Sequence, residues 1–168
     1  MFDKKNLEMY NNNRGVIMKI GIASDHRGYN LKQEIIKYLK NKKIEIIDYG
    51  TQSTESVDYP KFAFELSNAV VSKEVDFGIA ICGSGIGISI ACNKVKGIRC
   101  AKVDNVKEAY LTRFDNDANI LALNGTMPKF RAKDIVDKFL STDFSNLEKH
   151  IRRIKQINEY EEGKHNEC

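Results

Sequence analysis

The sequence predicts an α/β fold with three layers, in which helices cover both faces of a five-stranded parallel sheet. Two observations support this prediction. Short apolar runs rich in β-branched residues alternate along the chain with segments whose apolar residues recur at helical spacing. In the middle of the chain, residues 77–81 form an uninterrupted apolar run, which is typical of a strand buried on both faces of a sheet. Such an alternation favours a parallel sheet, as in Rossmann-like α/β/α sandwiches.

The chain ahead of the central run begins with a predicted strand and helix. Residues 18–23 form the strand. Leu31, Ile35 and Leu39 then recur at the spacing that places them on one face of a helix. The lysines between them, such as Lys32, are expected on the solvated face of this helix.

A second strand is predicted over residues 44–47, followed by a polar loop. Tyr59 and Pro60 then precede an amphipathic helix that contains Leu66 and Val70. Proline suits the first helical position, where a backbone N–H has no partner within the helix. The central strand is followed by a glycine-rich loop and small apolar residues, which predict a buried helix.

The second half of the chain continues the alternation. Residues 97–103 form the fourth predicted strand, and Asp104 is a plausible N-cap for a helix that runs to about Phe114. Residues 119–123 form the fifth strand, and Pro128 opens the helix after it. The sequence therefore predicts five strands, each followed along the chain by a helix.

The last helix is predicted from Ser145 and Glu148, which are spaced as a capping box. We expect one domain over residues 18–160, since the chain shows no linker and no internal repeat. Residues 1–17 are polar and asparagine-rich and are expected to be a disordered extension. Residues 161–168 are expected to be a frayed tail.

Composition argues against several kinds of partner. A formal net charge of +4, spread along helical patterns, does not indicate nucleic-acid binding. No apolar run approaches the ~20 residues that a membrane-spanning helix needs. The N-terminal segment has no apolar core or cleavage site of a secretory signal. These features predict a cytoplasmic protein without nucleic-acid or membrane partners.

The cysteines predict neither a metal site nor a disulfide framework. They contain no C-x-x-C pair and no cluster with nearby histidines. Free thiols fit a reducing compartment. For Cys92 and Cys100, which lie inside apolar patterns, a role as small buried side chains is expected. The four positions are Cys82, Cys92, Cys100 and Cys168.

The loop after the central strand carries the clearest functional signal. Cys82 ends the strand, and three glycines in the next five positions allow a sharp turn and close approach of backbone N–H groups to a ligand. A thiol among such N–H groups at a helix start is expected to form its thiolate readily. This arrangement suits a reactive cysteine beside a bound anion or a developing oxyanion. The loop residues are Gly83, Ser84, Gly85, Ile86 and Gly87.

Asp25 and His26 follow the first strand, and they should lie near Cys82 because ligands of such sheets gather outside the carboxyl ends of the strands. Each of the three also has a structural interpretation. Asp25 can cap the first helix, His26 can lie on the surface, and Cys82 can be an inert buried thiol.

A dinucleotide site is a competing interpretation of the glycine-rich loop. The G-x-G-x-G pattern before a helix resembles a dinucleotide fingerprint, and Asp104 lies at about the expected distance beyond it. However, Gly87 comes one residue too early for that fingerprint, and the loop follows the third strand rather than the first. We therefore rank dinucleotide binding below a site for a reactive thiol.

Taken together, several motifs resemble the type B ribose-5-phosphate isomerase family, which includes the galactose- and allose-6-phosphate isomerases. The resemblance covers residues 18 to about 159, in order and with similar spacing. The matching motifs are IASDHRG at 22–28, DYGT at 48–51, VDYP at 57–60, ICGSGIGISIACNKVKGIRC at 81–100, NDAN at 116–119 and KHIRR at 149–153.

The resemblance implies an aldose–ketose isomerase that acts on a sugar phosphate without metal or cofactor. In the family a cysteine thiolate moves a proton between adjacent sugar carbons through a cis-enediolate, and Cys82 matches this base. The backbone N–H groups of residues 83–87 would stabilise the enediolate oxygens, and Ser84 matches a residue that shuttles hydroxyl protons. The expected reaction interconverts ribose 5-phosphate and ribulose 5-phosphate, a step of the pentose phosphate pathway.

The resemblance also implies how the substrate is held and shared. Asp25 and His26 match a pair that holds the sugar and its phosphate end, and Tyr59 matches a tyrosine of the pocket. Family members are dimers or dimers of dimers whose sites borrow residues from the partner chain. Here the borrowed pair would be Asp115 and Asn116. Two further positions match the arginines that clamp the phosphate: Lys149 and Arg153.

Two positions depart from the family pattern. Asp115 stands where ribose-specific members usually have the ring-opening histidine, and Thr126 stands where many members have a phosphate-binding arginine. Lys129 or Arg131 can substitute for that arginine. A hexose 6-phosphate isomerase and a non-catalytic sugar-phosphate-binding protein therefore remain as alternatives. A non-catalytic binding protein would have no need for a thiol at the reacting carbon.

Overall fold

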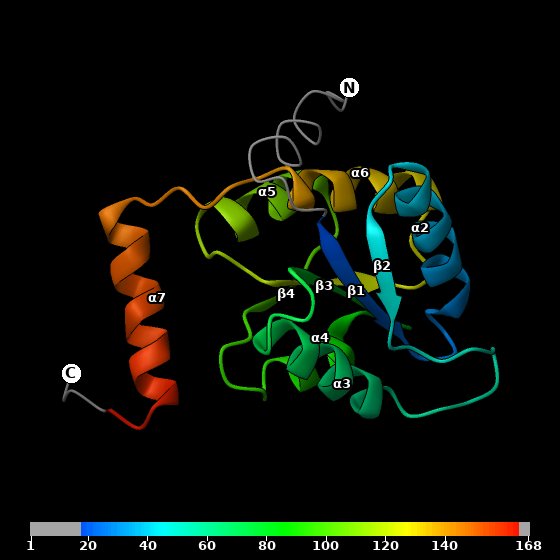
Figure 1. Ribbon diagram of the computed structural model, residues 1–168, viewed down its shortest axis with the longest axis horizontal. Helices are drawn as coiled ribbons and strands as arrows, with labels where there is room; N and C mark the ends of the chain where they lie inside the picture. The colour runs from blue at the N-terminus through cyan, green and yellow to red at the C-terminus, as the bar shows by residue number, and fades with distance from the viewer. Residues whose placement is uncertain (1–17, 165–168) are drawn as a thin grey trace.

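The computed structural model describes residues 18–164, so the predicted extension at 1–17 and the last four residues of the predicted tail lie outside the described part of the chain. Its sheet has five parallel strands in the order β2-β1-β3-β5-β4 (Figure 1). The central run of the sequence is therefore the central strand. The strands are β1 Lys19–Ser24, β2 Glu45–Asp48, β3 Phe77–Cys82, β4 Cys100–Lys102 and β5 Ile120–Asn124.

Helices cover both faces of this sheet (Figure 1). Core side chains from α2, α5 and α6 pack on one face, and core side chains from α3 and α4 pack on the other. This arrangement confirms the predicted three-layer α/β/α fold. The helices are α2 Tyr29–Asn41, α3 Tyr59–Val71, α4 Ile86–Cys92, α5 Val106–Phe114, α6 Lys129–Leu140 and α7 Glu148–Glu161.

The two faces of the sheet differ in side-chain size. Large aliphatic residues such as Ile22, Ile79 and Leu121 face the α2, α5 and α6 layer and are fully buried. The opposite face presents Ala23 and Ala80, which are also fully buried. Small side chains let α3 and α4 pack closely against this second face, near the carboxyl end of β3.

The helix α5 and its N-cap begin one residue later than predicted. Asn105, not Asp104, is the N-cap, and its side-chain oxygen accepts a hydrogen bond from the Glu108 N–H at 3.0 Å. The Glu108 carboxylate in turn accepts from the Asp104 N–H at 2.7 Å. This reciprocal pairing satisfies two N–H groups at the helix start, which a single aspartate cap would not do. The preceding strand β4 is also shorter than predicted.

The predicted capping box of the last helix was wrong. The α7 helix begins at Glu148, and its N-cap is Leu147 without a side-chain hydrogen bond. The Ser145 hydroxyl instead lies 2.8 Å from Nδ1 of His150 and accepts from the Leu147 N–H at 3.3 Å. Because His150 is buried at 4% exposure, its ring nitrogen needs a partner, and the serine provides it.

The α7 helix lies beyond the β4 edge of the sheet and contributes to neither core cluster of the described residues (Figure 1). It is amphipathic, and large apolar side chains along it remain 43–72% exposed. Among residues 18–164 no helix is long and apolar enough to cross a membrane. The exposed apolar residues around and on α7 are Leu147, Ile151, Ile157 and Tyr160.

Candidate active site

Three loops meet at the carboxyl edge of the sheet. The Asp25 N–H, after β1, donates to the Ile81 carbonyl of β3 at 3.2 Å. The Gly125 N–H, after β5, donates to the Cys82 carbonyl at 2.8 Å. A Cβ added at Gly125 would lie 2.6 Å from the Arg27 carbonyl oxygen, so the outer two loops also touch. The parallel order of the three central strands therefore brings their functional residues together.

Cys82 is the last residue of β3 at this edge, and only 4% of its surface is exposed. Its Sγ accepts a hydrogen bond from the Gly85 N–H at 3.2 Å. Gly85 has φ +76°, and a Cβ there would lie 2.9 Å from the backbone of Leu123. Only glycine meets both conditions without strain, because other residues disfavour this left-handed conformation. The loop thus aims an N–H donor at the sulfur, and such a donor stabilises a thiolate.

The predicted cradle of N–H groups is only partly available for a ligand. The Gly85 N–H is bound to the cysteine sulfur, and the Ile86 N–H donates to the Ser84 hydroxyl at 3.2 Å. Within the described chain, the N–H groups of Gly83, Ser84 and Gly87 have no hydrogen-bond partner. These three are the loop donors that remain for oxygen atoms of a ligand.

Asp25 organises the turn between β1 and α2. It is 5% exposed, and its Oδ1 accepts from the N–H groups of Arg27 and Gly28, both at 2.9 Å. Asp25 is therefore not the N-cap of the first helix, the alternative that the sequence left open, because that position is Gly28 without a side-chain cap; its carboxylate binds the turn before the helix instead. The same bonds fix its position beside Ile81, one residue before the cysteine.

His26 and Tyr59 connect the loop after β2 to the same edge. Nδ1 of His26 lies 3.2 Å from both the N–H and the carbonyl oxygen of Val57, so this loop holds the imidazole ring. The Tyr59 ring packs against Gly87, where an added Cβ would lie 2.7 Å from its Cζ. Tyr59 thus lies beside the glycine-rich loop, and His26 is held by the loop that leads to Tyr59.

Sequence reasoning missed two residues that support this edge. Lys32, expected on a solvated face, is fully buried, and its Nζ donates to the Asp48 carboxylate at 2.6 Å and to the Thr51 carbonyl at 2.6 Å. It thereby anchors the start of the β2–α3 loop. Arg27 lies over Gly83 of the cysteine loop. The sequence signal that could have identified Arg27 is its position directly after His26, at the end of the first strand.

Four predicted site residues lie away from Cys82 within one chain. Asp115 and Asn116 follow α5, where the Asp115 carboxylate lies 3.6 Å from Nε2 of His150 and the Asn116 carbonyl accepts from Arg99 at 3.1 Å. This is the amino edge of the sheet, since Arg99 immediately precedes β4. The other two are exposed on α7: Lys149 and Arg153.

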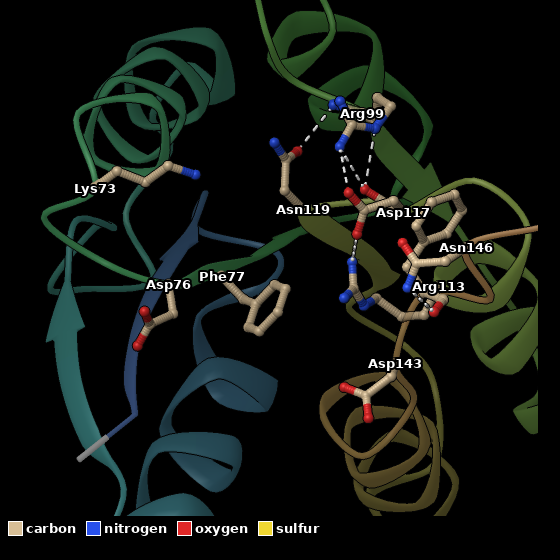
Figure 2. Close-up of a pocket in the computed structure, with 10 residues that line it drawn as sticks. Lys73, Asp76, Phe77, Arg99, Arg113, Asp117, Asn119, Asp143 and Asn146 are labelled. Atoms are coloured by element: carbon tan, nitrogen blue, oxygen red, sulfur yellow. Dashed lines mark hydrogen bonds and ion pairs between the residues drawn. The ribbon is translucent and has the colours of Figure 1, made fainter. Parts of the chain in front are cut away.

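A cavity of about 540 Å³ also lies at the amino edge, and Figure 2 shows the side chains that line it. Figure 2 shows Arg99 and Arg113 on either side of Asp117, whose carboxylate binds both, at 2.9 Å and 2.7 Å. The cavity contains none of the predicted site residues. A second cavity, of about 400 Å³, lies between the β4 edge and α7 and includes Asn116 and Ile157.

Comparison with known proteins identifies relatives of this chain. Ribose-5-phosphate isomerase B of Escherichia coli (strain K12) is 41% identical over 145 residues, which cover 86% of this chain and 97% of that protein. The structure of Clostridium thermocellum ribose-5-phosphate isomerase B matches with 51% identity and a TM-score of 0.85, covering 87% of this chain and 99% of that one.

A third match is the Mycoplasma genitalium ribose-5-phosphate isomerase B, whose structure was solved with bound ribulose-5-phosphate. It is 40% identical with a TM-score of 0.81, and the match covers 86% of this chain and 97% of that one. The family described as Ribose/Galactose Isomerase matches residues 20–157. This chain therefore belongs to the ribose/galactose isomerase family.

Proposed function

We propose that this protein interconverts ribose 5-phosphate and ribulose 5-phosphate as a cofactor-independent aldose–ketose isomerase. The observation that carries the proposal is the buried Cys82 sulfur, which accepts a hydrogen bond from the Gly85 N–H at the meeting point of three strand-end loops. The E. coli and C. thermocellum relatives are ribose-5-phosphate isomerases, and the M. genitalium relative binds ribulose-5-phosphate. A free thiol at this position fits a reducing cytoplasm.

The proposed reaction moves one proton from C2 to C1 and one hydroxyl proton from O2 to O1. The Cys82 thiolate removes the proton from C2 of the open-chain aldose, and the electron pair forms the C1–C2 double bond of a cis-enediolate. The resulting thiol then returns a proton to C1, which yields the ketose. The free N–H groups of Gly83, Ser84 and Gly87 stabilise the negative enediolate oxygens. The Ser84 hydroxyl already accepts from Ile86 N–H, so its own proton is available to move between these oxygens.

The remaining residues hold the substrate. We assign the sugar to Asp25, His26 and Tyr59, which lie on the two loops that border the glycine-rich loop. Lys149 and Arg153 neutralise the phosphate. Lysine keeps the positive charge but lacks the planar two-pronged geometry of arginine, so this clamp differs from an arginine pair.

We infer that the enzyme works as a homodimer, or a dimer of dimers, with shared sites. In one chain Asp115 and Asn116 lie at the opposite edge of the sheet from Cys82, and α7 packs on neither face. In the proposed dimer this pair reaches the partner's cysteine loop. There Asn116 completes the oxyanion site and Asp115 serves ring opening. The exposed apolar side chains of α7 would be buried against the partner.

Proton exchange at C2 of ribose 5-phosphate in heavy water tests the reaction and the base together. Wild-type enzyme should exchange this proton, and Cys82→Ala should lower the exchange rate by about 10²–10⁴-fold, the usual contribution of a general base. Cys92→Ala is the matched control, because Cys92 is buried in the core on the following helix and has no role in the proposed chemistry.

Three other outcomes have distinct meanings. Exchange with allose or galactose 6-phosphate, but not with ribose 5-phosphate, would make the protein a hexose 6-phosphate isomerase. Unchanged exchange in Cys82→Ala would assign the base to another residue. Binding of all three sugar phosphates without any exchange would show a binding protein and contradict an isomerase.

A further inference from the structure

The side chain of Arg27 lies directly on the loop that carries the cysteine. A Cβ built on Gly83 would lie 2.8 Å from both Cζ and Nε of Arg27 and 3.0 Å from its Cδ. The guanidinium therefore contacts the α-carbon of the residue that follows Cys82. The backbone of Arg27 is also fixed, since its N–H donates to the Asp25 carboxylate at 2.9 Å.

The Arg27 guanidinium has no charge partner in the described chain. It forms no hydrogen bond or ion pair with any of residues 18–164, and the residue is exposed. Arg99 and Arg113 contrast with it, because both are bound to the Asp117 carboxylate. A guanidinium with all five donors available is held at a candidate active site, where an anionic ligand can bind it.

The neighbouring loops do not supply a positive charge at this point. Residues 83–87, after β3, and residues 124–126, after β5, are uncharged. The Thr126 N–H and hydroxyl both bind the Asn124 side chain at 2.8 Å. Lys129, farther along, is already paired with Glu34 at 2.9 Å. Arg27 is thus the cation that the three meeting loops present.

We propose that Arg27 binds the phosphate group of the substrate at the mouth of the active site. This proposal rests on the proposed isomerase function. The reacting carbons must reach the buried Cys82 sulfur, so the charged phosphate end must point outward, where Arg27 is exposed. A guanidinium binds two phosphate oxygens at once through parallel N–H donors, and such charge-assisted pairs are strong.

Steady-state kinetics of Arg27→Gln tests this role. Because the phosphate contact is the same in the ground state and the transition state, KM should rise about tenfold or more, while kcat stays near the wild-type value. The KM of Arg27→Lys should lie between those of the wild type and Arg27→Gln, since lysine keeps the charge and loses the two-pronged contact. Lys40→Gln is the control, because it removes an exposed charge from the distant end of α2.

Binding of inorganic phosphate, measured by calorimetry, separates this proposal from the proposed function because it needs no turnover. Arg27→Gln should weaken phosphate binding about tenfold relative to Lys40→Gln, with the same thermal unfolding temperature. Equal phosphate affinity and equal KM in both variants would overturn the proposal. A loss confined to kcat would also overturn it, since Arg27 would then act at the reacting carbons. Wild-type inactivity alongside the predicted loss of phosphate binding would refute only the isomerase.

Discussion

Gly85 determines where the Cys82 sulfur finds its hydrogen-bond donor. The left-handed φ of +76° turns the Gly85 N–H toward Sγ, at 3.2 Å. Gly85 is also the N-cap of α4, which begins at the next residue. At the same point the chain passes close to Leu123 of β5. One backbone conformation therefore serves both the chemistry of the thiol and the packing of adjacent strands.

Gly85→Ala should destabilise the fold and reduce activity together. The left-handed conformation costs an alanine roughly 1–2 kcal/mol, and the contact with the Leu123 backbone adds strain that no side-chain rotation relieves. Urea unfolding measures the first effect and kcat the second. Gly163→Ala is the matched control, because Gly163 has φ +73° with no atom within 4 Å of an added Cβ. Equal losses in both variants would show that the Leu123 contact contributes nothing.

At the residue scale, the sequence predicted which residues come together better than it predicted their contacts. Cys82 and its glycines were predictable because strand end, thiol and glycine spacing are all local features. Two other findings were not. The Gly85 and Ile86 N–H groups form hydrogen bonds within the loop. Arg27 contacts Gly83, which is far from it in the sequence. Both depend on side-chain directions that a linear pattern does not contain.

At the element scale, Lys32 shows how burial overrides helical periodicity. Its spacing relative to Leu31 and Ile35 placed it between apolar positions, yet it is fully buried. The salt bridge to Asp48 and the bond to the Thr51 carbonyl offset the cost of desolvating the ammonium group. Such a partner lies on another element, so periodicity along α2 alone does not reveal it.

The α2 and α6 helices are joined by a second buried polar contact. The Tyr38 hydroxyl donates to the Asp137 carboxylate at 2.5 Å, and Lys42 donates to the other oxygen at 2.6 Å. Asp137 is 6% exposed. Burial raises the pKa of Tyr38 above its usual value, and the hydrogen bond and negative charge of Asp137 raise it further. The phenol therefore resists ionisation in the folded protein more than in the unfolded chain.

Stability should consequently decline in alkaline solution through this contact. A pKa raised on folding gives a contribution that is fully present below the unfolded tyrosine pKa of about 10 and is lost as pH rises above it. Urea unfolding between neutral pH and pH 11 should show a steeper decline for wild type than for Tyr38→Phe. Tyr110→Phe is the control, because the Tyr110 side chain is exposed on α5. Parallel declines in wild type and Tyr38→Phe would exclude Tyr38 as a source.

At the scale of the whole molecule, one chain separates its proposed active-site residues into two groups. Cys82, Ser84, Asp25, His26 and Tyr59 belong to loops at the carboxyl edge, whereas Asn116 and its neighbour lie at the amino edge. The strand order of a parallel sheet predicted that Asp25, His26 and Cys82 meet at one edge. The role of Asn116 and its neighbour was predicted only through family resemblance, because no local pattern indicates which edge of a partner a loop will meet. The exposed apolar side chains of α7 provide a surface for such a partner.

Subunit mixing tests whether the groups reunite across a dimer interface. Cys82→Ala and Asn116→Ala should each be nearly inactive alone. In a two-fold dimer that combines them, one site carries both substitutions and the other carries neither. Random mixing of equal amounts makes half of the dimers hybrid, each with one intact site of two, so about one quarter of wild-type activity should return.

Cys82→Ala mixed with Ser84→Ala is the control for this experiment. Both residues lie on the same loop of the same chain, so every site in the hybrid still carries one substitution. This mixture should show no more activity than the mean of the two variants measured separately. Recovery only in the first mixture requires that Asn116 act on the partner's Cys82. Failure of both mixtures, with hybrid dimers present by native mass spectrometry, would place the complete site within one chain.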